Sequence, residues 1–238
     1  MKTVLITGGS RGIGRAMVEL FSASGYAVAF TYKKSESEAK SLAESTGALA
    51  IYADSAVEAD VCGAVKFASD KLGHIDCLVN NAGVSSFSLF TDITLEEWNN
   101  HLAVNLTGAF LYSKAVIPSM VSRKYGRIIN ITSMWGITGS SCEVHYSTAK
   151  AGLIGMTKAL AKELGPSGIT VNAIAPGLIA TDMNSSLDAE SVECIAEETP
   201  LMRIGRADEV AKAALFLAGD DASFITGEIM NVSGGYIM

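Results

Sequence analysis

The sequence predicts an α/β fold built on one doubly wound parallel sheet of about seven strands, with helices on both faces. Short runs rich in β-branched residues alternate with longer helical stretches from one end of the chain to the other. Such strict alternation is typical of parallel strands joined by crossover helices. The first strand also leads directly into a glycine-rich turn, which favours the same class of sheet. No linker, repeat or charge block interrupts the pattern, so we expect residues 1–238 to form a single domain.

Each element follows from its own local pattern. The expected strands are short apolar runs bounded by turn residues, at 4–7, 27–32, 48–53, 77–80, 127–132, 170–174 and 228–232. The expected helices lie between them, near 13–23, 36–46, 57–72, 96–122, 146–164, 188–198 and 207–218. The least regular segment, 176–187, follows the sixth strand. Ligands bind beyond the carboxyl ends of such strands, so this segment is a candidate substrate lid.

Composition excludes several classes of function. The 238 residues are 49% hydrophobic and carry a net charge of −7, which disfavours nucleic-acid binding because phosphate contacts need clustered Lys and Arg. No apolar run reaches the roughly 18 residues that span a membrane, and the first residues lack the pattern of a signal peptide. The four cysteines are scattered, which predicts reduced thiols in a cytoplasmic protein. The three histidines lack partners at ligand spacing, so surface or packing roles are expected and no metal site.

The turn after the first strand reads TGGSRGIG at residues 7–14. Glycines let the backbone turn tightly and approach a pyrophosphate, whose charge the N-terminus of the following helix attracts. The glycine spacing is G-x-x-x-G-x-G rather than the general G-x-G-x-x-G fingerprint. Its position between a strand and a helix still predicts a dinucleotide-binding turn, with contacts from Gly8, Ser10, Arg11, Gly12, Ile13 and Gly14.

A second motif, Tyr146-x-x-x-Lys150, is expected to handle a proton. Positions i and i+4 share one face of a helix, so the Lys150 ammonium is expected beside the Tyr146 phenol. A nearby positive charge favours the phenolate and lowers the pKa of a tyrosine from its reference of about 10. A phenol tuned in this way can donate or accept a proton as a carbonyl and an alcohol interconvert.

The two motifs occur together with NNAG at 80–83, a serine at 133, PG at 176–177 and NVSGG at 231–235. In this combination, over essentially the whole chain, the sequence resembles the classical short-chain dehydrogenase/reductases, and among them the bacterial β-ketoacyl (3-oxoacyl) carrier-protein reductases. The resemblance implies a Rossmann-type fold, a nicotinamide cofactor and reduction of a ketone. A non-catalytic dinucleotide-sensing protein is the alternative class. Such relatives usually lose the tyrosine or the lysine, and this chain keeps both.

The resemblance also implies roles for individual residues. Tyr146 donates a proton to the ketone oxygen, and the Ser133 hydroxyl binds the same oxygen. Lys150 also holds the nicotinamide ribose, and Asn105 supports a water chain that replaces the proton. Further cofactor contacts are implied for Tyr146 and Lys150 themselves, for Asp54 at the adenine, for Asn80, Ala82 and Gly83 on the nicotinamide side, and for Pro176, Gly177, Ile179 and Thr181 in the following loop.

The end of the second strand predicts the choice of cofactor. Enzymes that use NAD often carry an acid there, which binds the ribose 2′-hydroxyl. This chain has Tyr32 at that place, followed by Lys33 and Lys34, with Arg11 nearby in the turn. A 2′-phosphate therefore meets positive charge and no acidic repulsion, which predicts NADP(H).

The segment between the two catalytic hydroxyls is expected to line the substrate pocket. Trp135 and Glu143 lie in it, and Met183 in the later loop is a third candidate. Three substrates stay open: a 3-oxoacyl group on acyl carrier protein, the 5-aminopentanone modification of elongation factor P, and another ketone. The signature around Glu143 resembles reductases of that modification, whose amine would be stabilised by a nearby carboxylate. The alternative interpretation is that Glu143 simply caps the helix that carries Tyr146. Possible contacts for an acidic carrier are Arg123, Lys124 and Arg127.

Two long helical stretches, 96–122 and 146–164, carry more apolar residues than one buried stripe requires. In the family that the chain resembles, these helices pair across a two-fold axis and the last strand forms a second interface. Closed symmetric assembly is the usual outcome of such contacts. We therefore expect a homotetramer.

Overall fold

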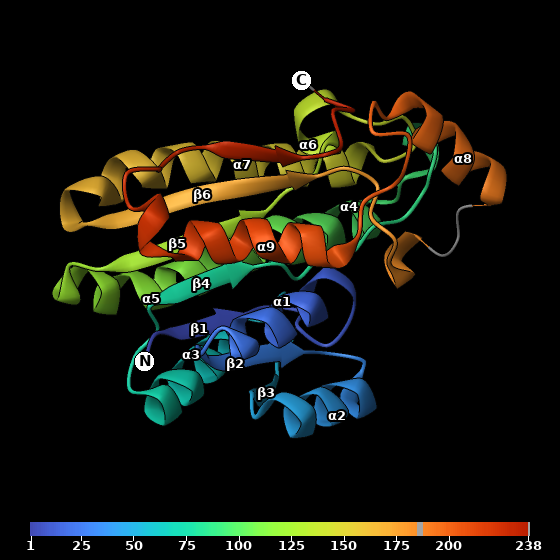
Figure 1. The fold of residues 1–238 in the computed structure, drawn as a ribbon. Helices are drawn as coiled ribbons and strands as arrows, with labels where there is room; N and C mark the ends of the chain where they lie inside the picture. The colour runs from blue at the N-terminus through green and yellow to red at the C-terminus, as the bar shows by residue number, and fades with distance from the viewer. Residues whose placement is uncertain (185–187, 238) are drawn as a thin grey trace.

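The computed structural model describes residues 1–184 and 188–237, and its centre is one all-parallel sheet of seven strands (Figure 1). The strand order is β3-β2-β1-β4-β5-β6-β7. The prediction of a doubly wound parallel sheet is confirmed, and every strand lies within two residues of its expected bounds. The strands are β1 (Thr3–Ile6), β2 (Ala27–Tyr32), β3 (Leu49–Tyr52), β4 (Cys77–Asn80), β5 (Gly126–Ile131), β6 (Ile169–Pro176) and β7 (Ile229–Val232).

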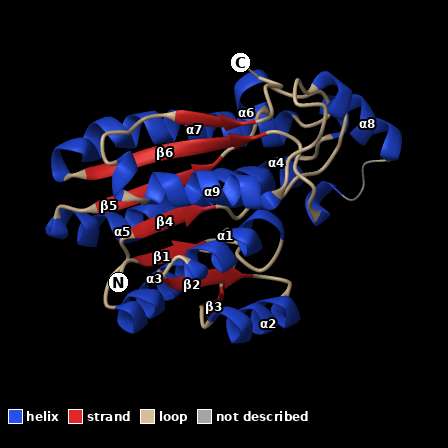
Figure 2. Ribbon diagram, in the orientation of Figure 1, coloured by secondary structure: helices blue, strands red, loops and turns tan. Residues whose placement is uncertain are grey.

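Helices cover both faces of the sheet (Figure 2). Alternate residues of a strand point to opposite faces, so Val4 and Ile6 of β1 pack into one core and Leu5 packs into the other. The first core is closed by α1 (Gly12–Ala23), α2 (Glu36–Thr46) and α9 (Ala207–Ala218). The second is closed by α3 (Glu58–Leu72), α5 (Gly108–Arg123) and α7 (Val144–Leu164).

The expected helix over 96–122 is interrupted. It consists of α4 (Leu95–Leu102), one π-helical turn (Ala103–Thr107) and then α5. A π turn inserts an extra residue without changing the apolar pattern on either side, so periodicity alone does not reveal it. Two short helices complete the site: α6 (Trp135–Thr138), which was not predicted, and α8 (Ala189–Glu198).

The direction of winding reverses between β1 and β4. The chain moves outward from β1 to β2 and β3, then returns to pair β4 on the other side of β1. Ligands of doubly wound sheets bind at the carboxyl ends of the strands at such a switch point. Residues 7–14 follow β1 and residues 81–83 follow β4, so the fold itself brings these two motifs together.

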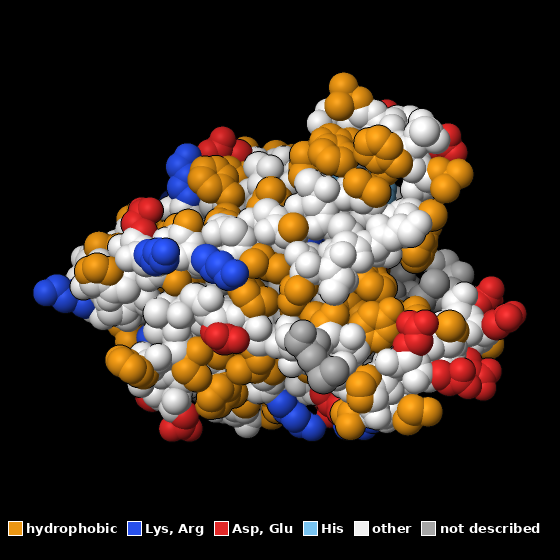
Figure 3. Space-filling view, turned by 90° about the horizontal axis from the view of Figure 1, so that it is seen from above, with side chains coloured by type: hydrophobic (Ala, Val, Ile, Leu, Met, Phe, Trp, Pro, Cys, Tyr) orange, Lys and Arg blue, Asp and Glu red, His pale blue; other side chains and the backbone are white. Residues whose placement is uncertain are grey.

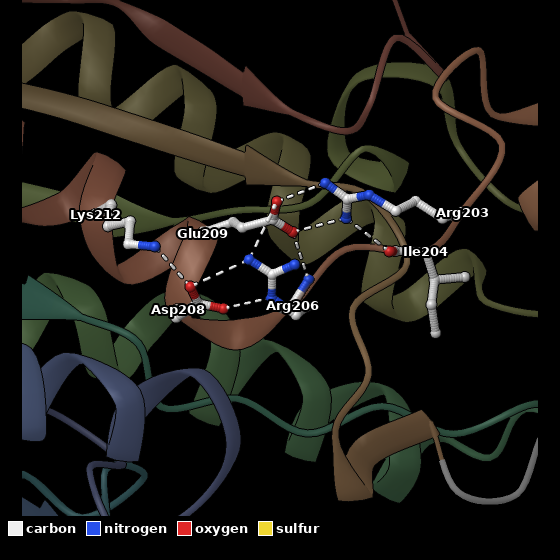
Figure 4. Close-up of polar contacts among 6 residues, drawn as sticks. All are labelled: Arg203, Ile204, Arg206, Asp208, Glu209 and Lys212. Carbon is white, nitrogen blue, oxygen red and sulfur yellow. Dashed lines mark hydrogen bonds and ion pairs between the residues drawn. The ribbon is translucent and has the colours of Figure 1, made fainter.

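A network of charged side chains fixes the start of α9 (Figure 4). Arg203 donates two hydrogen bonds to the Glu209 carboxylate, at 2.9 and 2.6 Å, and the backbone N–H of Arg206 donates a third. Asp208 accepts from Arg206 and from Lys212. These side chains are largely exposed, so the network contributes little stability and mainly orients the segment that leads into α9. Within 1–184 and 188–237, no helix is long and apolar enough to cross a membrane.

Candidate active site

A cavity of about 720 Å³ opens at the switch point. Its wall begins at the glycine-rich turn after β1, passes the ends of β2 and β4, and ends between α7 and the loop after β6. Most of the residues that the sequence marked as functional contribute to this one wall, although they lie far apart in the chain.

The glycine-rich turn is locked to the NNAG segment. The side chain of Asn81 donates to the carbonyl oxygens of Thr7 and Gly8, both at 3.0 Å, while the Thr7 hydroxyl accepts from the N–H groups of Asn81 and Ala82. Gly14 touches the same turn: an added Cβ would lie 2.1 Å from the Gly8 carbonyl oxygen. Sequence reasoning missed Thr7 and Asn81 as positioning residues, because their partners lie more than 70 positions away.

The same turn leaves backbone donors available to a phosphate. Helix α1 begins at Gly12, and the Arg11 side chain does not cap it. The first N–H groups of a helix have no intrahelical partners, and they attract negative charge. Thr181 packs beside this end, since its methyl group lies 3.3 Å from the position of a Cβ at Gly12. The residues present therefore fit a pyrophosphate.

Cationic side chains gather at the far end of the cavity. Arg11, Lys33 and Lys34 all line it, together with Tyr32. Lys33 forms an ion pair with Asp54 at 2.5 Å. Burial raises the pKa of the Asp54 carboxyl, but the hydrogen bonds from Lys33 and Ala56 outweigh it, so the net pKa is lowered. Asp54 thus orients Lys33 as well as lining the cavity.

The Tyr146-x-x-x-Lys150 motif lies on the opposite wall. Tyr146 and Lys150 come from α7, and Ser133 follows β5. The Lys150 ammonium donates to the carbonyl oxygen of Ile131 at 2.9 Å and lies 5.6 Å from the centre of the Tyr146 ring. The two side chains therefore lie close together, as expected.

The expected shift of the Tyr146 pKa is not observed. Burial raises that pKa to about 12, and the charge on Glu143 adds to the rise, while a hydrogen bond with Ser133 acts against it. Burial also lowers the pKa of Lys150 to about 8. The lysine turns its ammonium to a strand-end carbonyl rather than to the phenol oxygen, so desolvation dominates both groups.

Two expected site residues lie behind the wall instead of in it. Asn80 is buried at the end of β4, where its amide donates to Asn130 and Ser113, so it does not line the cavity, and its expected role on the nicotinamide side stays a prediction. Asn105 lies in the π turn, and its amide both donates to and accepts from the backbone of Val84. Its proton-relay role stays a prediction.

Glu143 lies at the substrate end. It is only 5% exposed and occupies the N-cap position of α7, yet its side chain makes no capping hydrogen bond. The carboxylate instead accepts from the Ser85 hydroxyl at 2.5 Å. Burial raises its pKa, while hydrogen bonds from Ser85 and Ser140 lower it. No cation pairs with Glu143 in the part of the chain that the structure describes. The helix-cap interpretation is therefore wrong for this side chain.

The remaining substrate candidates also line the cavity. Trp135 does so from α6 and packs edge-to-face on Tyr236, with ring centres 5.8 Å apart. Met183 lies in the expected lid segment and is half exposed. That segment is described as far as residue 184, and 185–187 lie outside the described residues. Ser191 and Ile195 of α8, which were not predicted, continue the wall beyond it.

The basic residues proposed as carrier contacts lie elsewhere. Arg123 is the last residue of α5, Lys124 follows it, and Arg127 is the second residue of β5. All three lie at the amino end of the strands and therefore opposite the cavity. Arg123 donates to Asp76 and to the Ile75 carbonyl, and Arg127 is buried. Of the three, only Lys124 is an exposed cation with no ion pair among the described residues.

The expected cofactor residues that line the cavity are Gly8, Ser10, Arg11, Gly12, Ile13, Gly14, Tyr32, Lys33, Asp54, Ala82, Gly83, Tyr146, Lys150, Pro176, Gly177, Ile179 and Thr181. No cluster of metal-ligating side chains is found in residues 1–184 and 188–237. The cavity thus joins the glycine-rich turn, a cationic end and the Ser133, Tyr146 and Lys150 side chains.

Comparisons with known proteins agree with this arrangement. The family model described as enoyl-(acyl carrier protein) reductase matches residues 8–237. A 3-oxoacyl-(acyl-carrier-protein) reductase of Synechocystis is 44% identical, over 100% of this chain and 97% of its own length. An acetoacetyl-CoA reductase of Shinella zoogloeoides is 44% identical over 98% of both chains. The 3-oxoacyl-(acyl-carrier-protein) reductase of Escherichia coli is 41% identical, over 100% of this chain and 98% of its own length.

Proposed function

Because the chain belongs to the short-chain dehydrogenase/reductase family, we propose that it uses NADPH to reduce a 3-oxoacyl thioester to the 3-hydroxyacyl product. One observation carries the proposal: Ser133, Tyr146 and Lys150 line the same cavity as the glycine-rich turn. The family model is described as an enoyl reductase, which would reduce a carbon–carbon double bond. The full-length relatives are instead named for reduction of 3-oxoacyl and acetoacetyl groups, which supports a ketone as the group that is reduced.

Tyr146, Ser133 and Lys150 have separate roles in the proposed reaction. When bound, the nicotinamide supplies the hydride that adds to the ketone carbon. Negative charge then grows on the ketone oxygen, to which Tyr146 gives its proton while the Ser133 hydroxyl holds that oxygen by a hydrogen bond. The raised pKa of Tyr146 keeps the phenol protonated at neutral pH, which suits a proton donor in the direction of reduction. Lys150 is fixed by Ile131 and is available to a ribose hydroxyl.

The preference for NADPH follows from charge at the cationic end. Replacing Tyr32 by Asp together with Lys33→Ala would put a carboxylate beside the 2′-phosphate and remove one cation, so preference should shift toward NADH. The measurement is the ratio of kcat/KM for the two cofactors, with Tyr32→Phe as the control that keeps the ring. An unchanged ratio in the double variant would put the 2′-phosphate site elsewhere.

A second substrate is favoured by Glu143. A buried carboxylate without a cation, at the substrate end of a cavity, is costly unless a ligand supplies the positive charge. Figure 3 shows acidic side chains at the tip where α8 lies in Figure 1; Glu190, Glu193, Glu197 and Glu198 of α8 are exposed. Both features suit a ketone that carries an amine, such as the 5-aminopentanone modification of elongation factor P, and neither suits an acidic carrier.

One variant separates the two substrates. If Glu143 pairs with an amine, Glu143→Gln should weaken aminoketone reduction roughly ten- to a hundredfold and spare neutral 3-oxoacyl thioesters, because a charge-assisted hydrogen bond contributes about 1.5–3 kcal/mol. If it opposes an acidic carrier, the same change should improve carrier-bound substrates at low salt. Glu163→Gln, an exposed acid near the other end of α7, is the control. Equal effects on both substrates would exclude a role for Glu143 in choosing between them.

We also infer a homotetramer of single-domain chains in the cytoplasm. Large apolar side chains remain exposed on α4 and α5, which make up the first of the two helical stretches expected at the interface: Leu95 of α4 is 74% exposed and Phe110 of α5 is 48% exposed. Exposed apolar residues of this size on adjoining helices are typical of an interface.

A further inference from the structure

The loop after β4 is tied to the π turn and to the start of α7 at several positions. Asn105 holds the backbone of Val84 in both directions, and the Ser85 hydroxyl donates to the Glu143 carboxylate. The N–H of Ser88 donates to the carbonyl oxygen of Cys142 at 2.8 Å. Val84, Ser85 and Phe87 line the cavity, so this loop is a wall of the substrate end.

At the centre of the loop, Ser86 lies between two buried histidines. Its hydroxyl oxygen is 3.0 Å from Nε2 of His101 and 3.1 Å from Nε2 of His145. The two rings are stacked, with centres 3.7 Å apart, and neither is more than 3% exposed. Neither histidine lines the cavity. One serine thus connects α4, α7 and the loop.

The Ser86 hydroxyl can donate one hydrogen bond and accept another, so it can join the two ring nitrogens when both rings are neutral. The N–H of Tyr146 donates to Nδ1 of His145, which links the same ring to the first turn of α7. One chain of hydrogen bonds therefore runs from His101 through Ser86 and His145 to the backbone of Tyr146.

We propose that Ser86, together with His101 and His145, is a positioning residue that holds the 84–88 loop against the first turn of α7 and so fixes the Glu143 carboxylate beside Tyr146. Ser86 does not line the cavity, so it contacts neither the reacting side chains there nor the glycine-rich turn. It acts through its neighbours in the chain, Ser85 and Phe87, and through the backbone of Tyr146. The proposal rests on the ketone reduction proposed above.

The test compares Ser86→Ala with two companions. Ser88→Ala is the matched control, since the Ser88 hydroxyl makes no hydrogen bond within the described residues and its backbone bond is kept. Ser86→Thr keeps the hydroxyl and should restore most of the activity. With NADPH and a ketone whose reduction Glu143→Gln weakens, Ser86→Ala should lower kcat/KM about tenfold, the scale of one lost positioning hydrogen bond, and leave the Kd of NADPH unchanged.

A double-mutant cycle identifies what Ser86 acts through. On a substrate that depends on Glu143, the loss caused by Ser86→Ala should shrink at least threefold in the Glu143→Gln background, because residues of one network are not additive. Additive losses, a parallel fall in NADPH affinity, or kcat/KM within twofold of the wild type would each overturn the proposal. His101→Phe keeps an aromatic ring in the stack and removes the ring nitrogen that contacts Ser86, so it replaces Ser86→Ala if that variant does not fold.

Amide hydrogen exchange needs no turnover, so it tests the positioning even if the substrate assignment fails. The N–H groups of Val84 and Ser88 are hydrogen-bonded, and they should exchange faster in Ser86→Ala than in Ser88→Ala. Equal exchange in the two variants would overturn the proposal. A wild-type enzyme inactive on all ketones would instead contradict the proposed function alone.

Discussion

Burial sets the protonation behaviour of the three ionisable side chains at the substrate end. The pKa of Tyr146 is raised to about 12, that of Lys150 is lowered to about 8, and that of Glu143 is raised. In each case desolvation is the largest cause. A phenol and a carboxylate in this environment gain from an added positive charge, so a cationic substrate would lower the pKa of both.

His101 makes stability depend on pH. Burial and the neighbouring His145 lower its pKa from 6.5 to about 4. Between these values the unfolded chain binds the proton more readily, so stability is lost as pH falls from 6.5 through 4. From pH 7 to pH 5 the loss should be about 2 kcal/mol. Urea unfolding at both pH values should show this loss of stability in the wild type and a smaller loss in His101→Phe, where His145, whose pKa burial also lowers, still contributes. Equal losses in the two proteins would contradict the shifted pKa of His101.

The chemistry-bearing residues were predictable from sequence, whereas their surroundings were not. Tyr146 and Lys150 share a helix face at fixed spacing, so local geometry was enough to bring them together. The bond from Ser85 to Glu143 joins residues 58 positions apart, and no local pattern encodes it. The Tyr146 pKa was predicted in the wrong direction for the same reason, because burial depends on the whole fold.

At the scale of elements, the strands and most helices follow from alternating apolar patterns, and the exceptions are local. The π turn inside the predicted 96–122 helix keeps the apolar stripe and adds one residue, so the pattern looks continuous. Helix α6 is only four residues long, too short for any periodicity. Both exceptions lie beside the proposed catalytic residues, where Asn105 holds the backbone of Val84 and Trp135 lines the cavity.

The glycine-rich turn gives an element-scale prediction. In Gly14→Ala, the new Cβ would meet the Gly8 carbonyl oxygen and the Asn81 amide, so the turn must open. We expect NADPH binding to weaken at least tenfold, measured by fluorescence titration. Gly63→Ala in α3 is the control, since a Cβ there meets nothing within 4 Å, and alanine should stabilise that helix by up to about 1 kcal/mol. Equal NADPH affinity in both variants would contradict the role of the turn.

At the scale of the molecule, exposed apolar residues on α4 and α5 lead to the assembly prediction. Four chains of 24.9 kDa give a particle of about 100 kDa, and light scattering at micromolar concentration should find it. Replacing Leu95 and Phe110 by Lys should shift the mass toward smaller species, because charge at the centre of an interface opposes association. A wild-type mass near 25 kDa would refute the tetramer.

The central claim is that Tyr146 donates the proton during NADPH-dependent ketone reduction. Its most direct test is the single-turnover rate of NADPH oxidation with a 3-oxoacyl thioester, compared between the wild type and Tyr146→Phe, with NADPH affinity measured in parallel. Removing the hydroxyl while keeping the ring should lower the rate at least about a hundredfold and leave NADPH binding intact, as expected for a lost general acid. A variant that oxidises NADPH at nearly the wild-type rate would contradict the claim.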